Sequence, residues 1–305
     1  MSHLDRKGKF ALFSIFSNTL LIIFKVVAGV LSGSVSIISE AIHSAMDLVA
    51  SIVAFLSVRG SAKPADKDHP YGHGKIENIS GVVEGGLIFI AAGMIIVEAA
   101  KKVFAPVEIE QAFIAIAVMM LAAMVNFFVS EKLYQVAKEE DSMALEADAL
   151  HLKTDVYTSL GVGFGILLIK ITGFVIFDSI VAILVALLII KEAWVLCKNA
   201  LEHLIDVRLT DEEEKEIDEI IKKVTNIYAN QLIDYHKLKT RKAGNKRHID
   251  FHITLNQDLT VKEAHDIVGS LKKEINFKFC NSRVNVHIDP AKSQDSQEKN
   301  EDYNI

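Results

Sequence analysis

Cysteine is scarce in this sequence, with only Cys197 and Cys280 among 305 residues. The two lie far apart and form no CxxC pair, which excludes a disulfide-stabilised scaffold and a thiolate zinc knuckle. Any bound metal must therefore be held by nitrogen and oxygen atoms. An excess of positive charge is also lacking, since the formal net charge is −6. No strongly basic face is predicted, which excludes the nucleic-acid-binding classes that depend on one.

Charge is distributed unevenly along the chain, half of whose residues are hydrophobic. Residues 1–200 carry 35 charged side chains, whereas the last 105 residues carry 37. An ordinary soluble domain has its charges spread more evenly. The first part of the chain is therefore suited to lipid and the last part to water.

Six apolar stretches are long enough to cross a bilayer, which a helix of about 20 residues spans. The first is too long for a removable signal peptide, and a second follows it after only two residues. We predict a polytopic α-helical membrane domain over residues 1–206 with six transmembrane helices. Their approximate bounds are 10–31, 34–58, 79–100, 111–136, 144–171 and 174–197.

Basic side chains indicate which connections face the cytoplasm. The N-terminal segment and the longer polar connection between the second and third spans are both basic, and positive residues favour the cytoplasmic side. Both termini and the connections after the second and fourth spans are predicted to be cytoplasmic, in a bacterial inner or plasma membrane. The basic residues concerned are Arg6, Lys7, Lys9, Arg59, Lys63, Lys67 and Lys75.

From Thr210 onward the pattern is that of a soluble domain. Thr210 with Glu213, and Thr260 with Glu263, form capping boxes that open amphipathic helices. Alternating runs at 232–240, 248–255 and 283–288 predict strands, the first two joined as a hairpin. The order α-β-β-α-β predicts an α+β, ferredoxin-like domain over residues 207–290, with helices on one face of an open sheet. Residues 291–305 are predicted to be a disordered tail.

Two of the predicted spans contain the pattern HxxxD, His43 to Asp47 in the second and His151 to Asp155 in the fifth. This spacing places both side chains on one helix face. Ionisable groups inside apolar helices are costly unless paired, so they are candidates for function. If the two helices are neighbours, two imidazoles and two carboxylates converge, which suits a tetrahedral Zn²⁺ and cancels its charge. The alternative is that each histidine pairs with its own aspartate as a packing ion pair.

A second group lies in the connection between the second and third spans. Asp66, His69 and His73 have side chains able to hold a metal together with a water molecule. The alternative is a solvated polar turn, in which Pro70 and Gly72 shape the backbone.

A third group lies in the soluble domain. His287 and Asp289, at i and i+2 of the last strand, face the same side of the sheet. Together with His236, His252 and His265 they form a set able to build a two-metal site bridged by Asp289. The alternative is a set of unrelated surface histidines.

Several other ionisable residues lie in or near the predicted spans, and five of them are interpreted as follows. Glu84, Glu98 and Asp178 are interpreted as helix-packing or helix-end residues without an assigned role. Lys25 and Lys170 are expected to extend toward an interface.

Taken together, these patterns resemble the cation diffusion facilitator family. The resemblance covers residues 8–290 and includes the six spans, the two HxxxD motifs, a metallochaperone-like cytoplasmic domain and the loop pattern DxxHxxxHGK from Asp66 to Lys75. It implies a homodimeric divalent metal/proton antiporter that exports cations from the cytoplasm and is not an enzyme. One departure concerns His43, where many bacterial members carry Asp; two His and two Asp resemble the set of zinc-selective members.

The resemblance also implies roles for individual residues. The two HxxxD motifs would form the transport site, Asp66 with His69 and His73 the loop site, and the third group the binuclear site at the dimer interface. Lys75 and Asp206 match positions that form a salt-bridge interlock near the membrane surface in bacterial relatives. Zn²⁺ is then both the expected substrate and a regulatory ligand, with no organic cofactor, and Cd²⁺, Co²⁺, Fe²⁺ and Mn²⁺ are the alternative substrates.

Two other functional classes fit the sequence less well. An intramembrane metalloenzyme needs an open coordination position and a general base, and the sequence has neither an HExxH helix nor a spare carboxylate beside the two motifs. A membrane-anchored metal sensor would leave the transmembrane HxxxD pairs unexplained. We therefore predict Zn²⁺/H⁺ exchange by alternating access.

Overall fold

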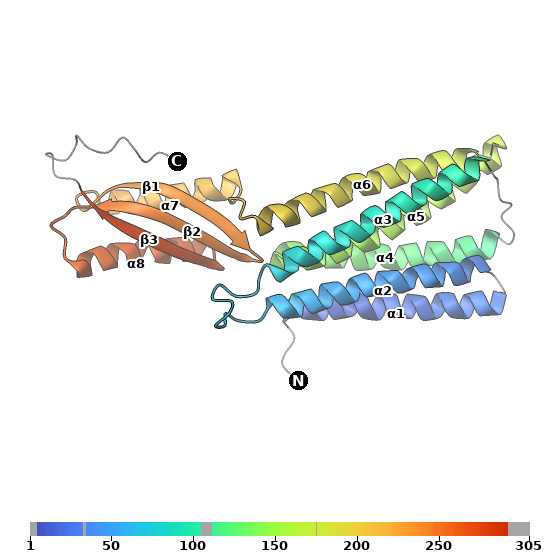
Figure 1. Cartoon of the computed structure of the whole chain (residues 1–305), viewed down its shortest axis with the longest axis horizontal. Helices are drawn as coiled ribbons and strands as arrows, with labels where there is room; N and C mark the ends of the chain where they lie inside the picture. The colour runs from blue at the N-terminus through green and yellow to red at the C-terminus, as the bar shows by residue number, and fades with distance from the viewer. Residues whose placement is uncertain (1–4, 33–34, 105–111, 175, 292–305) are drawn as a thin grey trace. The chain divides into compact units, whose positions relative to one another are not determined.

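The computed structural model describes residues 5–32, 35–104, 112–174 and 176–291, and the chain divides into two compact units, Met1–Ile205 and Asp206–Ile305. Except for Ala291, the predicted disordered tail lies outside the described residues. The first unit is helical (Figure 1). Its described helices are α1 (Arg6–Ser32), α2 (Val35–Ser61), α3 (Ile76–Phe104), α4 (Ala112–Glu140), α5 (Met143–Thr172) and α6 (Ile176–Leu204).

The outward faces of these helices are apolar. Phe16 of α1, Ile90 of α3 and Trp194 of α6 are each more than 60% exposed, which is the surface expected of a protein that contacts lipid. Among the described residues, four helices are apolar and long enough to span a membrane: Arg6–Leu31, Ile76–Lys101, Ala117–Glu140 and Ser179–Leu204. Helix α5 is not one of the four, and its first half carries Glu146, Asp148, Lys153 and Asp155. The unit is therefore a helical membrane domain, and the predicted total of six spans remains a prediction.

The helices extend beyond the spans that hydropathy predicts. Helix α4 continues from the predicted end at 136 to Glu140, and α6 continues from 197 to Leu204. Hydropathy marks only the stretch that lies in hydrocarbon, whereas the polar residues beyond it are also good helix formers. A 29-residue helix is about 44 Å long, against about 30 Å for the bilayer core.

In the first unit, some helices pack on their neighbours in the sequence and others pack on helices that are distant in the sequence. Helix α1 packs on α2 and α4 on α5, but α3 packs mainly on α6, and α5 contacts α2, α3 and α6. Gly85 permits the close approach of α3 to α6, because a Cβ there would clash with Sγ of Cys197. The contact between α2 and α5 brings the two HxxxD helices together.

The second unit contains α7 (Asp211–Ile227), β1 (Leu232–Ala243), β2 (Lys246–Leu255), α8 (Val261–Lys278) and β3 (Ser282–Pro290), which confirms the predicted order. Both predicted capping boxes are present, at Thr210 and at Thr260. The turn after β1 contains Gly244 with φ +60°. Strand β2 is central, antiparallel to β1 and parallel to β3.

One face of this sheet packs against the two helices (Figure 1). Alternate residues of β2, including Ile249, Phe251 and Ile253, are buried in the core with Ile217 of α7 and Leu271 of α8. The residues between them therefore lie on the opposite face. The strand register places His252 beside both His236 of β1 and His287 of β3. The histidines of the three strands are thus collected on the face away from the helices.

Candidate metal sites

A direct contact joins the two HxxxD helices. Nε2 of His151 on α5 lies 3.1 Å from Oδ1 of Asp47 on α2, and both side chains are buried. Asp155, one turn further along α5, is half-buried and accepts a hydrogen bond from Nδ2 of Asn126 at 3.4 Å. His43 lies in α2, but its side chain is outside the described part of the structure. Imidazole nitrogen and carboxylate oxygen from two helices thus face one another, which is suitable chemistry for a divalent transition metal.

Lys25 departs from its predicted position. Its side chain is only 6% exposed, and Nζ donates a hydrogen bond of 2.6 Å to Oγ of Ser44 on α2. The prediction that Lys25 extends toward an interface is therefore wrong. Hydropathy places the residue inside an apolar helix but does not reveal that the helix face carrying it packs on α2 beside the first HxxxD motif.

Asp148 is a buried acidic residue on the same helix face as His151, so the statement that no spare carboxylate lies beside the two HxxxD motifs is wrong. It is fully buried, and Oδ1 accepts a hydrogen bond of 2.8 Å from Oγ of Ser51. Ser51 in turn is hydrogen-bonded to Ser14 and to Asn18 of α1 at 3.0 and 2.8 Å. The signal in the sequence was the spacing, because Asp148 precedes His151 by three residues and so shares its helix face.

A network of buried polar side chains joins the helix ends next to the connection between α2 and α3. Glu77 of α3 is 1% exposed, and its Oε1 lies 3.0 Å from Nζ of Lys7 and accepts a hydrogen bond of 2.7 Å from Ser61. The hydroxyl of Ser142 donates to the other oxygen of Glu77. The buried ion pair of Lys7 and Glu77 therefore joins α1 to α3, and the two serine hydroxyls connect Glu77 to α2 and to the short link before α5.

The connection between α2 and α3 brings its three predicted ligands together. Nδ1 of His69 lies 3.2 Å from Oδ1 of Asp66, and Nε2 of His73 lies 3.5 Å from Oδ2. The backbone is turned by a hydrogen bond of 2.9 Å from the amide of Gly72, with φ +88°, to the carbonyl of His69. The backbone amide of His69 donates a hydrogen bond of 2.6 Å to Oδ1 of Asp66. This hydrogen bond is the main reason that the pKa of the Asp66 carboxyl is lowered. The carboxylate is therefore ionised at neutral pH, as a metal ligand must be.

The sheet of the second unit also gathers a potential metal site. Ligand atoms of His236, His252 and Asp289 all lie within 4.8 Å of one another. Oδ2 of Asp289 is 2.9 Å from Nδ1 of His252 and 3.3 Å from Nε2 of His236, while Oδ1 is 3.3 Å from Nε2 of His287. The hydrogen bond from His252 is the main cause that lowers the pKa of Asp289, with the three imidazoles acting in the same direction against partial burial. Both oxygens of one carboxylate thus face imidazole nitrogens, which is the arrangement a bridging ligand requires.

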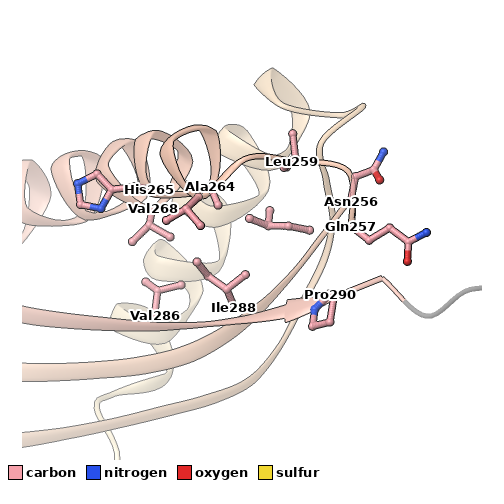
Figure 2. Close-up of a pocket in the computed structure, with 11 residues that line it drawn as sticks. Asn256, Gln257, Leu259, Ala264, His265, Val268, Val286, Ile288 and Pro290 are labelled. Carbon is pink, nitrogen blue, oxygen red and sulfur yellow. The ribbon is translucent and has the colours of Figure 1, made fainter.

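His265 is placed elsewhere in the same unit. It lines an apolar cavity of about 460 Å³ together with residues of α8, β3 and the connection after β2. Figure 2 shows His265 and Val268 on α8, with Val286 and Ile288 on the strand opposite. His287 alternates with these two strand residues and so faces the other side of the sheet. Within a single chain, His265 is therefore separated from Asp289 by the sheet, and its role as a ligand remains a prediction.

The two residues of the predicted interlock have described contacts of their own. Nζ of Lys75 donates to the carbonyl of Leu204 at 3.1 Å. Oδ1 of Asp206 accepts from Arg241 at 3.2 Å. Because the pair of Lys75 with Asp206 would connect the two units, it stays a prediction.

His248 of β2 provides a test of stability against pH. It is 4% exposed, and the strand register places Arg241 and Arg283 beside it. Burial first, and then these two guanidinium groups, lower its pKa from the usual 6.5. Since the unfolded chain binds the proton more tightly, the free energy of unfolding is expected to fall as the pH drops below about 6.5.

The measurement is urea unfolding of residues 206–291 at pH 8 and pH 5.5, with chelator present, for the wild type and His248→Gln. Loss of stability between the two pH values should be smaller in the variant. At pH 8 the side chain is neutral in both the folded and the unfolded state, so this pH supplies the reference. Equal losses in the two proteins would show that His248 does not carry the effect.

Comparison with known proteins finds a family match for each of the two units. Residues 11–205 match the cation efflux transmembrane domain, and residues 209–291 match the cytoplasmic domain of cation efflux proteins. The chain is 32% identical to an uncharacterized transporter of Synechocystis, over 92% of this chain and 89% of that protein. It is 30% identical to the manganese efflux system protein MneP of Bacillus subtilis (92% and 95%) and 28% identical to the cation-efflux pump FieF of Shewanella oneidensis (91% and 92%).

The first unit is a helical membrane domain with a buried imidazole–carboxylate contact, and an α/β unit follows it. Both units match domains of one family. This chain therefore belongs to the cation efflux, or cation diffusion facilitator, family of metal efflux transporters.

Proposed function

We propose that this protein exports Zn²⁺ from the cytoplasm in exchange for protons. The observation that carries the proposal is the buried contact between Asp47 of α2 and His151 of α5, 3.1 Å apart across two packed helices. Such a pair at membrane depth is costly unless it has a role that requires it. A transported cation supplies that role, and His43 and Asp155 complete the proposed four-ligand site.

The donor set favours zinc. Two imidazoles and two carboxylates match the tetrahedral nitrogen and oxygen coordination of Zn²⁺, and their two negative charges neutralise the ion. Manganese is the second candidate, since MneP of Bacillus subtilis is named a manganese efflux system protein. Cd²⁺, Co²⁺ and Fe²⁺ also remain candidate substrates.

The proposed topology has six transmembrane helices, α1 to α6, with both termini in the cytoplasm. Residues 1–206 form the transmembrane domain and residues 207–290 the cytoplasmic domain. The basic residues next to the connection between α2 and α3 support this orientation. On this topology the closed network of Lys7, Glu77, Ser61 and Ser142 lies at the cytoplasmic end of the helices.

Proton exchange follows from the chemistry of the ligands. An imidazole binds either a proton or a metal at its ring nitrogen, and metal binding releases protons from histidine and carboxyl ligands. A site that is loaded on one side of the membrane and emptied on the other therefore moves protons in the opposite direction to the metal.

The test is zinc uptake into proteoliposomes that contain the purified full chain and a trapped zinc indicator. An acidic lumen is expected to accelerate uptake, because protons leaving the vesicle drive zinc inward, and an alkaline lumen is expected to slow it. Addition of Mn²⁺ or Cd²⁺ as a competitor ranks the candidate metals. Zinc uptake that is independent of the pH gradient, or that survives Asp155→Ala, would contradict the proposal.

The second unit is proposed to bind two zinc ions and to stabilise a homodimer. His236, His252, His287 and Asp289 would hold the metal on the open face of the sheet, with His265 as a further ligand. Zinc bound there would act on the transporter as a regulator and would not itself be transported. Asp66, His69 and His73 are proposed to form a separate metal site in the connection between α2 and α3.

A further inference from the structure

The first turn of α1 contains two adjacent basic residues that contact different helices. Arg6 is exposed, and its guanidinium nitrogens lie 2.5 Å from Oε2 of Glu139 and 3.4 Å from Oε1 of Glu140, at the end of α4. Lys7 is buried, and its Nζ lies 3.0 Å from Oε1 of Glu77, the second residue of α3. The side chains of Lys7 and Glu77 are only 9% and 2% exposed. The beginning of α1 is therefore joined to α4 by an exposed ion pair and to α3 by a buried one.

Both oxygens of the Glu77 carboxylate have hydrogen-bond partners. Oε1, which faces Lys7, also accepts from the hydroxyl of Ser61 at 2.7 Å, and Oε2 accepts from the hydroxyl of Ser142. Ser61 is the last residue of α2, and Ser142 directly precedes α5. These two helices are the ones whose buried contact forms the proposed transport site. One carboxylate thus connects the beginning of α1 and of α3, the end of α2 and the link before α5.

Buried side chains fill the space between this network and Asp47. Positions 47, 51, 54, 58 and 61 of α2 are spaced by three or four residues, so they share one helix face. Three residues of this face are each 0% exposed, namely Ser51, Ala54 and Val58. Val58 belongs to one apolar cluster with Leu145, which lies in the first turn of α5 and is also 0% exposed. This face of α2 is therefore closed from its end up to Asp47.

The chemistry of the ion pair suits a contact that opens and closes. Taking two charges out of water costs about as much as their attraction returns, so apolar side chains of similar volume often hold two helices at least as firmly. Lys7 and Glu77 lie in the first turns of their helices, where water can solvate both charges once the helices separate. Removing only one partner has a different effect, because it leaves an unpaired charge that disfavours the closed arrangement.

We propose that Lys7 and Glu77, together with the hydroxyls of Ser61 and Ser142, form a reversible lock on the helical unit. While the lock is closed, the four helix ends are held together and Asp47 cannot be reached from them. When the lock opens, a cation can enter along the buried face of α2. The cytoplasmic location of the lock rests on the proposed function, whereas its effect on access does not.

The experiment measures how fast a water-soluble maleimide alkylates the thiol introduced by Ala54→Cys, in the full chain in lipid nanodiscs. Ala54 lies on the closed face of α2, and Cys197→Ala with Cys280→Ser removes the two native thiols. A thiolate reacts only where the reagent can reach it, so the reaction should be slow while the lock is intact. Lys7→Gln and Glu77→Gln should each accelerate it at least about tenfold, because each leaves an unpaired buried charge.

Two control variants make similar changes at exposed positions. Arg6→Gln removes the neighbouring exposed ion pair, and Glu98→Gln replaces an exposed carboxylate on α3. Both should react within about twofold of the protein with the intact lock, because exposed ion pairs contribute little. Exchanging the charges by Lys7→Glu with Glu77→Lys restores an ion pair, and the serine hydroxyls can also accept from an ammonium. This exchange should slow the reaction again, whereas either change alone should leave it fast.

Two results would overturn the lock. One is an equal alkylation rate in the intact protein and in Lys7→Gln and Glu77→Gln. The other is a fast rate that the charge exchange does not slow, because loss of packing and not loss of the ion pair would then explain it.

Failure of the lock is distinguishable from failure of the transport proposal. The alkylation rate requires neither zinc nor a pH gradient. If zinc uptake ignored the gradient while the single variants reacted fast and the charge exchange slowly, the proposed function would fail and the lock would stand. Uptake driven by the gradient together with unchanged alkylation rates would remove the lock only.

Discussion

Replacing Asp47 by asparagine is expected to reduce zinc uptake into proteoliposomes at least about 100-fold. Losing even an outer-shell partner of a metal ligand commonly costs 10–100-fold in metal affinity, and Asp47 is proposed as a ligand itself. The variant also removes the charge that faces His151 at 3.1 Å, so the site is no longer neutral when it contains a divalent cation. Initial zinc uptake rates under an acidic lumen measure the effect.

Glu98→Gln provides the control for this substitution as well. It exchanges a carboxylate for an amide in the same helical unit, but at an exposed position. Its uptake rate should remain within about twofold of the wild type, which is below the effect that a ligand change produces. A rate for Asp47→Asn close to that of Glu98→Gln would remove Asp47 from the transport site.

The second large effect is expected in the cytoplasmic domain, where Asp289→Asn should abolish stabilisation by zinc. The carboxylate of Asp289 faces three imidazoles within 3.3 Å, and its lowered pKa keeps it ionised at neutral pH. A ligand present at 100 times its Kd stabilises the folded state by about 2.7 kcal/mol. The wild-type domain should gain stability of this order from zinc, and the variant should gain little.

Urea unfolding of residues 206–291 with and without zinc measures this change, and light scattering measures whether zinc doubles the mass. Asp258→Asn is the matched control, because Asp258 is exposed in the connection between β2 and α8. It should respond to zinc as the wild type does. An equal zinc effect in Asp289→Asn would show that the metal binds elsewhere, and an unchanged mass in the wild type would oppose the proposed dimer.

Local patterns in the sequence predicted most of the secondary structure. The capping boxes at Thr210 and Thr260 mark where α7 and α8 begin, because they depend on residues only three positions apart. Alternation predicted the strands, although β1 extends to Ala243 and contains a bulge near Lys237, whose φ is +54°. A bulge leaves little trace in the alternation of hydrophobic residues.

The membrane unit was harder to predict because hydropathy describes one helix at a time. It located the helices and singled out the HxxxD motifs, but it interpreted Lys25 as extending toward an interface and gave Glu84 no role. Both side chains are buried, 6% and 0% exposed. Their burial depends on which helix faces meet, and the pairing of α3 with α6 and of α2 with α5 joins segments that are distant in the chain.

The sequence by itself determined that the first part of the chain is suited to lipid and the last part to water. It also determined the order of the elements and the residue types able to bind metal. These features follow from composition, periodicity and i,i+4 spacing, which are local properties. Only the tertiary structure decided which of those residues meet. Helix packing brings His151 to Asp47 and Asp148 to Ser51, and strand register brings His252 to Asp289 but leaves His265 on the other face of the sheet. Such long-range contacts arise from the complementary packing of distant faces, which no local pattern specifies.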